Sequence, residues 1–575
     1  MKKLKFAAAL LSACLMVFVS CGGGDDAKKL SAEEQFKVAV SKALVDNAKL
    51  IAHGLTETKN TVQLSNYGQD LVLSLEVGEP LQSIVNSILT SNYLEYSTQW
   101  LKSVQVSAST GLTDNAMKVS VKAGLNSTDI LSLNIFEDSK NSTIYFSIPE
   151  LIKTNFKLSE QDFGFSVRQL MNDYLAQVSF YGNAPEEAVF TGFIEEIVNA
   201  IASSVNQVSR STEELKAGLN GKSIAANYTL LSARLNEDAG NRMASSIENV
   251  IRTSTNFNTI ANWLVPVISK VEGYKIRVKD FTEEIAEEVA YLFEDLFYYS
   301  EVDLKLYVDA QSNLAGIRVD IEDEGSVLAC MPQKGGNFGY TFAVAEGSAD
   351  LASENIHTYA IAALNGYGSY SGGKMTGDFK VYAEGEEVLS FETKALDITQ
   401  LKSLKANGSL AFHPKAETRE MIKDELEYEL DLDSSLLSFI DNLDFSINMS
   451  QKDYSSASMG LGLTSGNSNF LSMNVKSTIS KPGEIKMPSA DIKTLDEDSI
   501  EDYEDILSGI STSGIVANLK KAKVAPEFIT PLESLTGEML GELVEDYLYG
   551  SSSYNYYDDY DYYDDYDYYD YYDYW

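Results

Sequence analysis

Side chains that could do chemistry are scarce in this sequence. Its three histidines, His53, His357 and His413, lie far apart and beside no nucleophile motif. A histidine-based triad or a zinc site needs several such groups close together, so each histidine is expected at the surface or in a capping role. The sequence therefore predicts no catalytic residue, no metal site and no cofactor site.

One stretch imitates a nucleotide-binding loop. Residues 368–374, G-S-Y-S-G-G-K, match the phosphate-binding pattern G-x-x-x-x-G-K-[ST] up to its last position. Met375 then stands where a hydroxyl should hold magnesium, and both flanks alternate like strands, so we interpret the stretch as a turn. Acidic residues are so abundant that no carboxylate pair is singled out, which leaves glycoside hydrolysis open as an alternative.

The three thiols divide between the body and the N-terminus. Cys330 lies in an apolar strand pattern, which predicts a buried, unreactive thiol. Cys14 and Cys21 lie in or at the end of a leader in which Lys2, Lys3 and Lys5 precede an apolar run, 6–20. That run is too short to span a bilayer comfortably, and it predicts an export signal over residues 1–20.

The pair Ser20-Cys21 resembles the lipobox of bacterial lipoproteins. The resemblance implies that Cys21 takes a diacylglycerol and becomes the first mature residue. Leu11-Ser12-Ala13-Cys14 also fits the pattern, but cleavage there would leave an apolar mature N-terminus, so Cys21 is favoured. The following Asp25-Asp26 resembles export signals of Bacteroidota-type surface lipoproteins, which implies the exterior of the outer membrane, with its periplasmic face as the alternative.

Charge restricts the partners. The formal net charge is −40, and it becomes −43 once the three lysines of the leader are removed. Such a surface repels phosphate backbones, so nucleic acid is excluded as a partner. The apolar content of 44% still supports sizeable cores. The expected partners are the membrane, through the lipid anchor, and an amphiphile, a glycan or a protein.

Hydrophobic periodicity then predicts the elements. A capping box at Ser31 and Glu34 opens a helix that should end at Gly54, and Pro80 opens a second. Period-two alternation from 101 to about 158 predicts an antiparallel meander. A mainly helical middle follows. It begins with a helix over 185–208, continues with a strand over 223–235 and a helix near Trp263 that Pro266 interrupts, and ends with a helix capped by Asp280. Strands resume with a hairpin over 302–321.

The predicted fold class is α+β, with a large curved antiparallel sheet and packed helices. A duplicated sheet is the alternative to a single one. An apolar-apolar-Ser-apolar pattern recurs at 130–133, 388–391, 470–473 and 72–75, which suggests return strands of similar hairpins. On the hairpin and these strands the body resembles the Lol-type lipoprotein carriers, which implies an incurved sheet closed by helices.

The predicted organisation has five parts. A leader over 1–20 and a polar tether over 21–30 precede a helix and meander region over 31–299 and a β-rich region over 300–550, and a tail over 551–575 ends the chain. Residues 554–575 hold twelve Tyr and eight Asp with no aliphatic side chain, which predicts disorder. The tail is either simply solvated or a partner-docking segment.

The sequence thus favours a lipid-anchored outer-membrane protein that acts by binding or assembly. The alternative is a cell-surface hydrolase that cleaves glycans with paired carboxylates.

We expect Cys21→Ala to abolish labelling by palmitate analogues and to release the protein from the membrane fraction. The matched variant Cys14→Ala should change neither, and loss of labelling in that variant would contradict the cleavage assignment.

Overall fold

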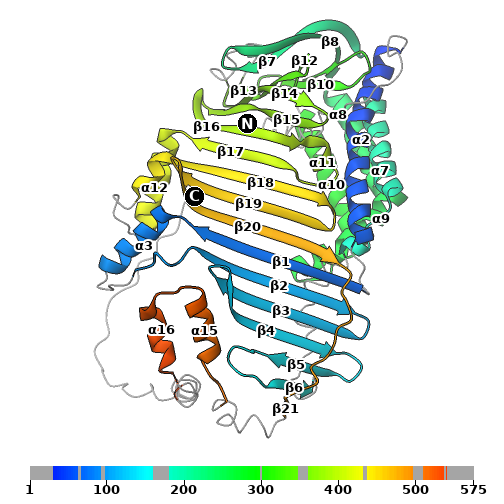
Figure 1. Ribbon diagram of the computed structural model, residues 1–575. Coiled ribbons are helices and arrows are strands. Elements are labelled where there is room, and N and C mark those ends of the chain that lie inside the picture. Colours follow the sequence, from blue (N-terminus) through cyan, green and yellow to red (C-terminus); the bar gives the residue numbers. More distant parts are fainter. Residues whose placement is uncertain are drawn as a thin grey trace, which may run out of the picture.

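The structure is a computed structural model (Figure 1). The residues that it describes are 30–61, 66–91, 97–159, 180–297, 301–346, 360–430, 437–495, 509–535 and 539. The leader, Cys21, the tether up to residue 29, His357 and the Tyr/Asp tail lie outside the described residues.

The five strands between 103 and 159 form the predicted meander, and the strand before them pairs with its first strand. The alternating apolar and polar residues of 117–123 lie in one of these strands. A two-residue turn with positive φ at Asn126 and Ser127 connects that strand to the next. The strands are β1 Asn66–Val77, β2 Ser103–Thr113, β3 Ala116–Leu125, β4 Thr128–Asp138, β5 Thr143–Ser147 and β6 Asn155–Ser159.

The remaining strands follow the helical middle or lie within it. The expected hairpin over 302–321 is confirmed as β9 and β10. The first set is β7 Ser209–Leu219, β8 Lys222–Leu235, β9 Val302–Val308, β10 Leu314–Ile321, β11 Gly325–Cys330, β12 Gln333–Lys334 and β13 Asn337–Glu346. The second set is β14 Ala362–Ser371, β15 Lys374–Ala383, β16 Glu386–Asp397, β17 Gly408–Pro414, β18 Leu443–Asp453, β19 Ser456–Ser465, β20 Ser468–Ser480 and β21 Ile492–Leu495.

All of these strands belong to one twisted, curved sheet, which confirms the predicted α+β class. Strand pairing runs from β7 through β8, β9, β10, β11, β13 and β14 to β20, and then from β1 to β6 and β21. Pairing between described strands is antiparallel except for β6 with β21. Hydrogen-bonded strands lie on both sides of the expected boundary at 299, and the division of the chain there stays a prediction.

Three of the four apolar-Ser patterns are return strands. They lie in β4, β16 and β20, each paired with the strand before it in the chain. The pattern at 72–75 lies in β1, which follows a helix and pairs with β20 and β2 instead. The pattern therefore marks strands whose two faces differ, and it does not always mark a hairpin.

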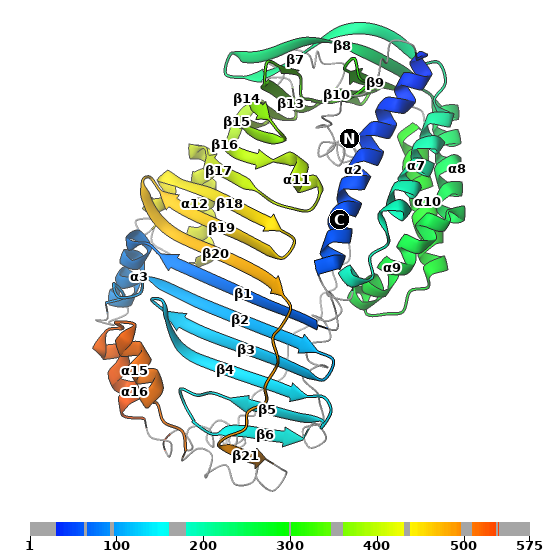
Figure 2. The ribbon, with the colours of Figure 1, turned by 45° about the vertical axis from the view of Figure 1, so that its right-hand side comes forward.

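A layer of helices covers one face of the sheet at the β8 to β13 end (Figure 2). Its apolar stripes, with Phe257 and Ala286 among them, pack on Leu231, Leu306 and Val327 of the sheet. These helices are α2 Ala32–Thr61, α7 Glu187–Ser204, α8 Glu237–Thr253, α9 Thr255–Glu272 and α10 Val278–Phe297.

The smaller helices lie mainly near strand ends and between strands. They are α3 Glu79–Ser91, α11 Ile398–Lys402, α12 Ala416–Leu430, the 3-10 helix η3 Ser438–Asn442, α15 Ser513–Lys521 and α16 Pro526–Glu533. α15 and α16 pack on the sheet near Ile130 of β4.

The expected boundaries of three helices need correction. α9 runs through Pro266 without a break, and Asp280 lies inside the first turn of α10 rather than at its cap. At α2 the capping box is confirmed, since the Ser31 amide donates to Glu34 at 2.8 Å and the Glu34 amide donates to the Ser31 hydroxyl at 3.1 Å. The expected end at Gly54 is wrong, because α2 continues to Thr61.

The reason for a glycine at position 54 is close packing. A Cβ there would lie 2.5 Å from the backbone oxygen of Ser403, just after α11. Gly54 therefore lets α2 approach the loop that follows α11 rather than ending the helix.

We expect Gly54→Ala to destabilise the protein by about 1–3 kcal/mol, because the methyl group meets backbone that cannot rotate away. This loss should outweigh the helix-propensity gain of about 1 kcal/mol for alanine. Urea denaturation measures the change. Gly483→Ala, where a Cβ meets nothing within 4 Å, is the control and should leave the transition midpoint unchanged.

Candidate functional site

Of the residues singled out for chemistry, the described ones lie on different elements. Cys330 is fully buried in β11, which confirms the predicted burial, and this burial raises the pKa of its thiol to about 12. The loop-like stretch is the hairpin turn between β14 and β15, with Gly372 and Gly373 at φ 58° and 83°. His53 is exposed on α2, and His413 lies on β17 with its Nδ1 3.2 Å from Asp444.

Acidic residues do gather in a depression of about 490 Å³, which is lined mostly by charged side chains from β8 to β10 and the turn after β10. At its floor, Asp320 accepts hydrogen bonds from Lys305 at 2.9 Å, Arg318 at 2.7 Å and Ser326 at 2.6 Å. Burial alone would raise the pKa of this carboxyl group, but the three donors outweigh it and hold the pKa below its ordinary value. The described residues include no cluster of three His, Cys, Asp or Glu side chains able to hold a metal ion.

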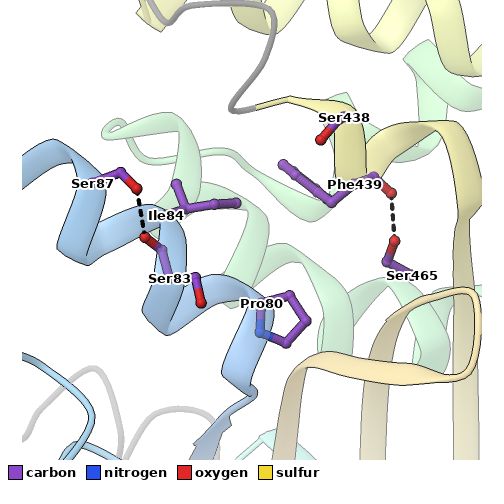
Figure 3. A pocket seen from close by; sticks show the side chains of 7 residues that line it. All are labelled: Pro80, Ser83, Ile84, Ser87, Ser438, Phe439 and Ser465. Carbon is purple, nitrogen blue, oxygen red and sulfur yellow. Dashed lines mark hydrogen bonds between the residues drawn. The ribbon is translucent and has the colours of Figure 1, made fainter.

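A second hollow, of about 370 Å³, lies between α3 and η3 (Figure 3). Its apolar walls come from Pro80, Ile84 and Phe439, and Phe439 stacks on Phe470 with ring centroids 4.1 Å apart. Three of its hydroxyl groups donate to nearby carbonyl oxygens: Ser83 to Glu79, Ser87 to Ser83 and Ser465 to Phe439. The residues that line this hollow are all uncharged, so it offers no acid or base.

A further candidate surface is an apolar strip on one face of β18, β19, β20 and β1 to β4. Strand register places its central row on a single face, because residues paired across neighbouring antiparallel strands point the same way. That row is Met449, Met459, Val475, Leu73, Val106, Ala123 and Leu131. A flanking row holds Leu71, Ala108, Val121 and Leu133.

Side chains of this apolar strip are open to solvent. The exposed fractions are 40% for Leu71, 38% for Leu73, 40% for Val106, 36% for Leu133 and 41% for Met459. The opposite face of the same strands is polar, with the row Asn448, Gly460, Asn474, Ser74 and Gln105. A soluble sheet normally buries its apolar face, so the exposure of this one calls for a functional explanation.

The apolar strip continues the face that the helices cover. A row of aromatic side chains crosses the intervening strands, from Tyr340 past Gly366 to Phe379, Phe391, Phe412 and Phe445. Phe379 and Phe391 stack with ring centroids 4.8 Å apart. One end of a single apolar face is therefore buried under helices, and its far end forms a buried cluster around Met117 and Ile144, whereas the strip between them is exposed.

Sequence reasoning missed the apolar strip as a site. The alternation within β1, β3 and β20 was visible, and it correctly predicted strands with two different faces. The strip itself forms only because β1 pairs with β20, which comes some 400 residues later in the chain.

Comparisons with known proteins add little. No family model matches this chain, and no curated protein matches it. The solved structure of intact Ap-TbpB (N and C lobes) aligns over 72% of this chain and 77% of that chain, with a TM-score of 0.10 and 8% identity, which is too low to carry an argument. Among the described residues, no helix has the length and apolar character needed to cross a membrane.

The charged depression generates a test of stability. We expect Asp320→Asn to lower the melting temperature at pH 7, because it removes the ionised acceptor of Lys305 and Arg318. The folded pKa of Asp320 lies below the ordinary 3.8, so its stabilisation is present above that value and lost as the pH falls through the folded pKa.

The melting difference between Asp320→Asn and the unmodified protein should therefore shrink below about pH 4. Asp378→Asn, at an exposed position on β15, serves as control and should melt like the unmodified protein. A difference for Asp320→Asn that stays constant from pH 7 to pH 3 would contradict the ion-pair account.

Proposed function

We propose that this chain is a lipid-anchored outer-membrane lipoprotein that faces the cell exterior and acts by binding a partner on its apolar strip. The observation that carries the proposal is the exposed apolar strip over β18 to β20 and β1 to β4. Contiguous exposed apolar surface in a soluble domain marks interaction sites. The lipid anchor rests on the lipobox-like Ser20-Cys21 pair.

Two carboxyl groups, Asp320 and Glu387, do not have the pKa that a glycosidase acid needs. A glycosidase acid needs a carboxyl group with a raised pKa. At Asp320 the pKa is lowered instead, since hydrogen bonds and cations outweigh burial. At Glu387 burial is likewise outweighed by hydrogen bonds from Lys380 and Lys415, and its pKa is also lowered. These carboxylates act as ion-pair partners that stabilise the sheet.

The anchor would attach near one end of the sheet, several strands away from the apolar strip. The N-terminal half of α2 is held near β7 and the β9–β10 turn by two hydrogen bonds. Arg210 donates to the backbone oxygen of Ser31, and Lys42 donates to the backbone oxygen of Gln311. A tether over residues 22–30 reaches at most about 30 Å. The strip begins several strands further along the sheet, where neighbouring strands lie about 4.8 Å apart, so it projects away from the attachment point.

Site-specific photo-crosslinking in intact cells tests this proposal. A photoreactive amino acid at Val106, on the apolar strip, should give a discrete adduct, whether with protein or with lipid. The same probe at Ser107, the next residue of β2 but on the opposite face, is the matched control and should give none. Equal labelling at both positions, or no adduct at either, would contradict a binding role for the strip.

A further inference from the structure

We infer that the hollow between α3 and η3 binds one ring of an uncharged sugar (Figure 3). This hollow is separate from the apolar strip, so the inference goes beyond the proposed function and does not depend on it. Four features of the structure support it: the fixed position of the two walls, the uncharged lining, the acceptor character of the serine hydroxyls, and an aromatic ring that a second ring supports.

Both walls of the hollow are fixed to the same hairpin, β19–β20. On the α3 side, the Gly78 amide donates to the backbone oxygen of Phe470 at 3.1 Å, and the Asn469 backbone leaves no room for a Cβ at position 78. On the η3 side, the Ser465 hydroxyl donates to the backbone oxygen of Phe439 at 2.8 Å. The fold itself therefore holds the hollow open, so little conformational entropy is lost when a ligand enters.

The lining excludes ionic ligands. None of the described residues that line the hollow is charged, although 23% of the chain is Asp, Glu, Lys or Arg. An ion that leaves water needs an opposite charge beside it. Phosphate, carboxylate and ammonium groups would find none here. The volume of about 370 Å³ is near the lower end of the range for small-molecule sites, about 300–1,000 Å³, so the ligand is small and uncharged.

The serine hydroxyls select a ligand that donates hydrogen bonds. Three of them already donate to backbone carbonyl oxygens, Ser83 at 3.0 Å, Ser87 at 2.9 Å and Ser465 at 2.8 Å. A hydroxyl has one proton and two lone pairs, so these three groups can only accept a further hydrogen bond. A hydrocarbon would strip water from their oxygens without replacing its hydrogen bonds, whereas a ligand rich in hydroxyl groups replaces them.

The apolar part of the lining selects a ring. Ile84 on α3 and Phe439 on η3 point toward each other across the hollow (Figure 3). Phe470 stacks on one face of the Phe439 ring, so only the other face and the rim are available to a ligand. The face of an aromatic ring carries partial negative charge, which attracts the polarised C–H groups of a sugar. A sugar ring therefore matches the hollow, with hydroxyls at its edge for the serines and C–H groups on its face for Phe439.

The experiment measures binding by saturation-transfer NMR, with the full acylated protein in phosphatidylcholine liposomes and empty liposomes as the blank. The probes are the methyl glycosides of glucose, galactose, mannose and N-acetylglucosamine. Two matched control ligands are glucuronic acid, which adds a charge, and cyclohexanol, which keeps a six-membered ring but has a single hydroxyl.

At least one of the four glycosides should bind saturably, with a dissociation constant on the order of 1 mM. Ordinary ligand efficiency gives this affinity to a molecule of about 13 non-hydrogen atoms. Glucuronic acid and cyclohexanol should each bind at least tenfold more weakly than that glycoside, because the first brings an unpaired charge into the hollow and the second leaves most of the serine oxygens without a donor.

Variants then assign the binding to the hollow. Ser83→Ala and Ser87→Ala should each weaken it about threefold to tenfold, because each removes one acceptor. Both serines are exposed on α3, where alanine favours the helix, so the fold is retained. Ser438→Trp, at an exposed position of η3, should abolish binding by filling the hollow. Ser450→Ala, exposed on β18 and outside the hollow, is the matched control and should bind like the unmodified protein.

Three results would overturn the inference. A lack of saturable signal from all four glycosides, well above the expected dissociation constant, would show that the hollow holds no sugar. Equal binding of cyclohexanol would show that it takes any apolar ring, and binding that survives Ser438→Trp would place the sugar elsewhere on the molecule. A discrete adduct at Val106 in cells would stand in each case, because that crosslink tests the apolar strip and not the hollow.

Discussion

The rest of the structure depends on the pairing of β1 with β20. This antiparallel ladder joins residues 68–77 to residues 471–480, so the first strand of the chain lies beside one of the last. Without it, the N-terminal meander and the C-terminal meander would each end in an unpaired strand. Exposed strand edges invite pairing with other chains, and the ladder removes two of them at once. It also places the apolar faces of the two meanders on the same side of the sheet.

The sheet buries its apolar residues to different extents along its length. Near β8 and β9 the helices supply the second layer, and Leu231, Leu306 and Val308 are almost completely buried. The β7 strand also turns back over β13 on the other face, where Ala217 passes so close to Gly339 that a side chain would not fit. The middle of the sheet, around Leu73 and Val106, is partly exposed, and the surface of interest lies there.

This uneven covering explains why the apolar strip is an open surface rather than a pocket. Two hollows among the described residues lie elsewhere, between α3 and η3 and above the ion pairs of Asp320. Each is lined by groups that are largely engaged within the protein, such as the Ser465 hydroxyl with Phe439 and the Asp320 carboxylate with Arg318. Binding on the exposed sheet face would require no such contact to break.

Local sequence determined much of this protein. Alternation fixed β3 and the β9–β10 hairpin, the Ser31 and Glu34 pair fixed the start of α2, and Pro80 lies in the first turn of α3, because each signal acts between residues that are neighbours in the chain. Local signals gave wrong predictions where packing overrides them: α2 continues past Gly54, and α9 passes through Pro266. The polar strand β7 was not predicted at all, because its conformation depends on pairing with β8. Only the tertiary structure decided the apolar strip, since Leu73 and Val475 share a face through contacts between distant segments whose pairing no local pattern encodes.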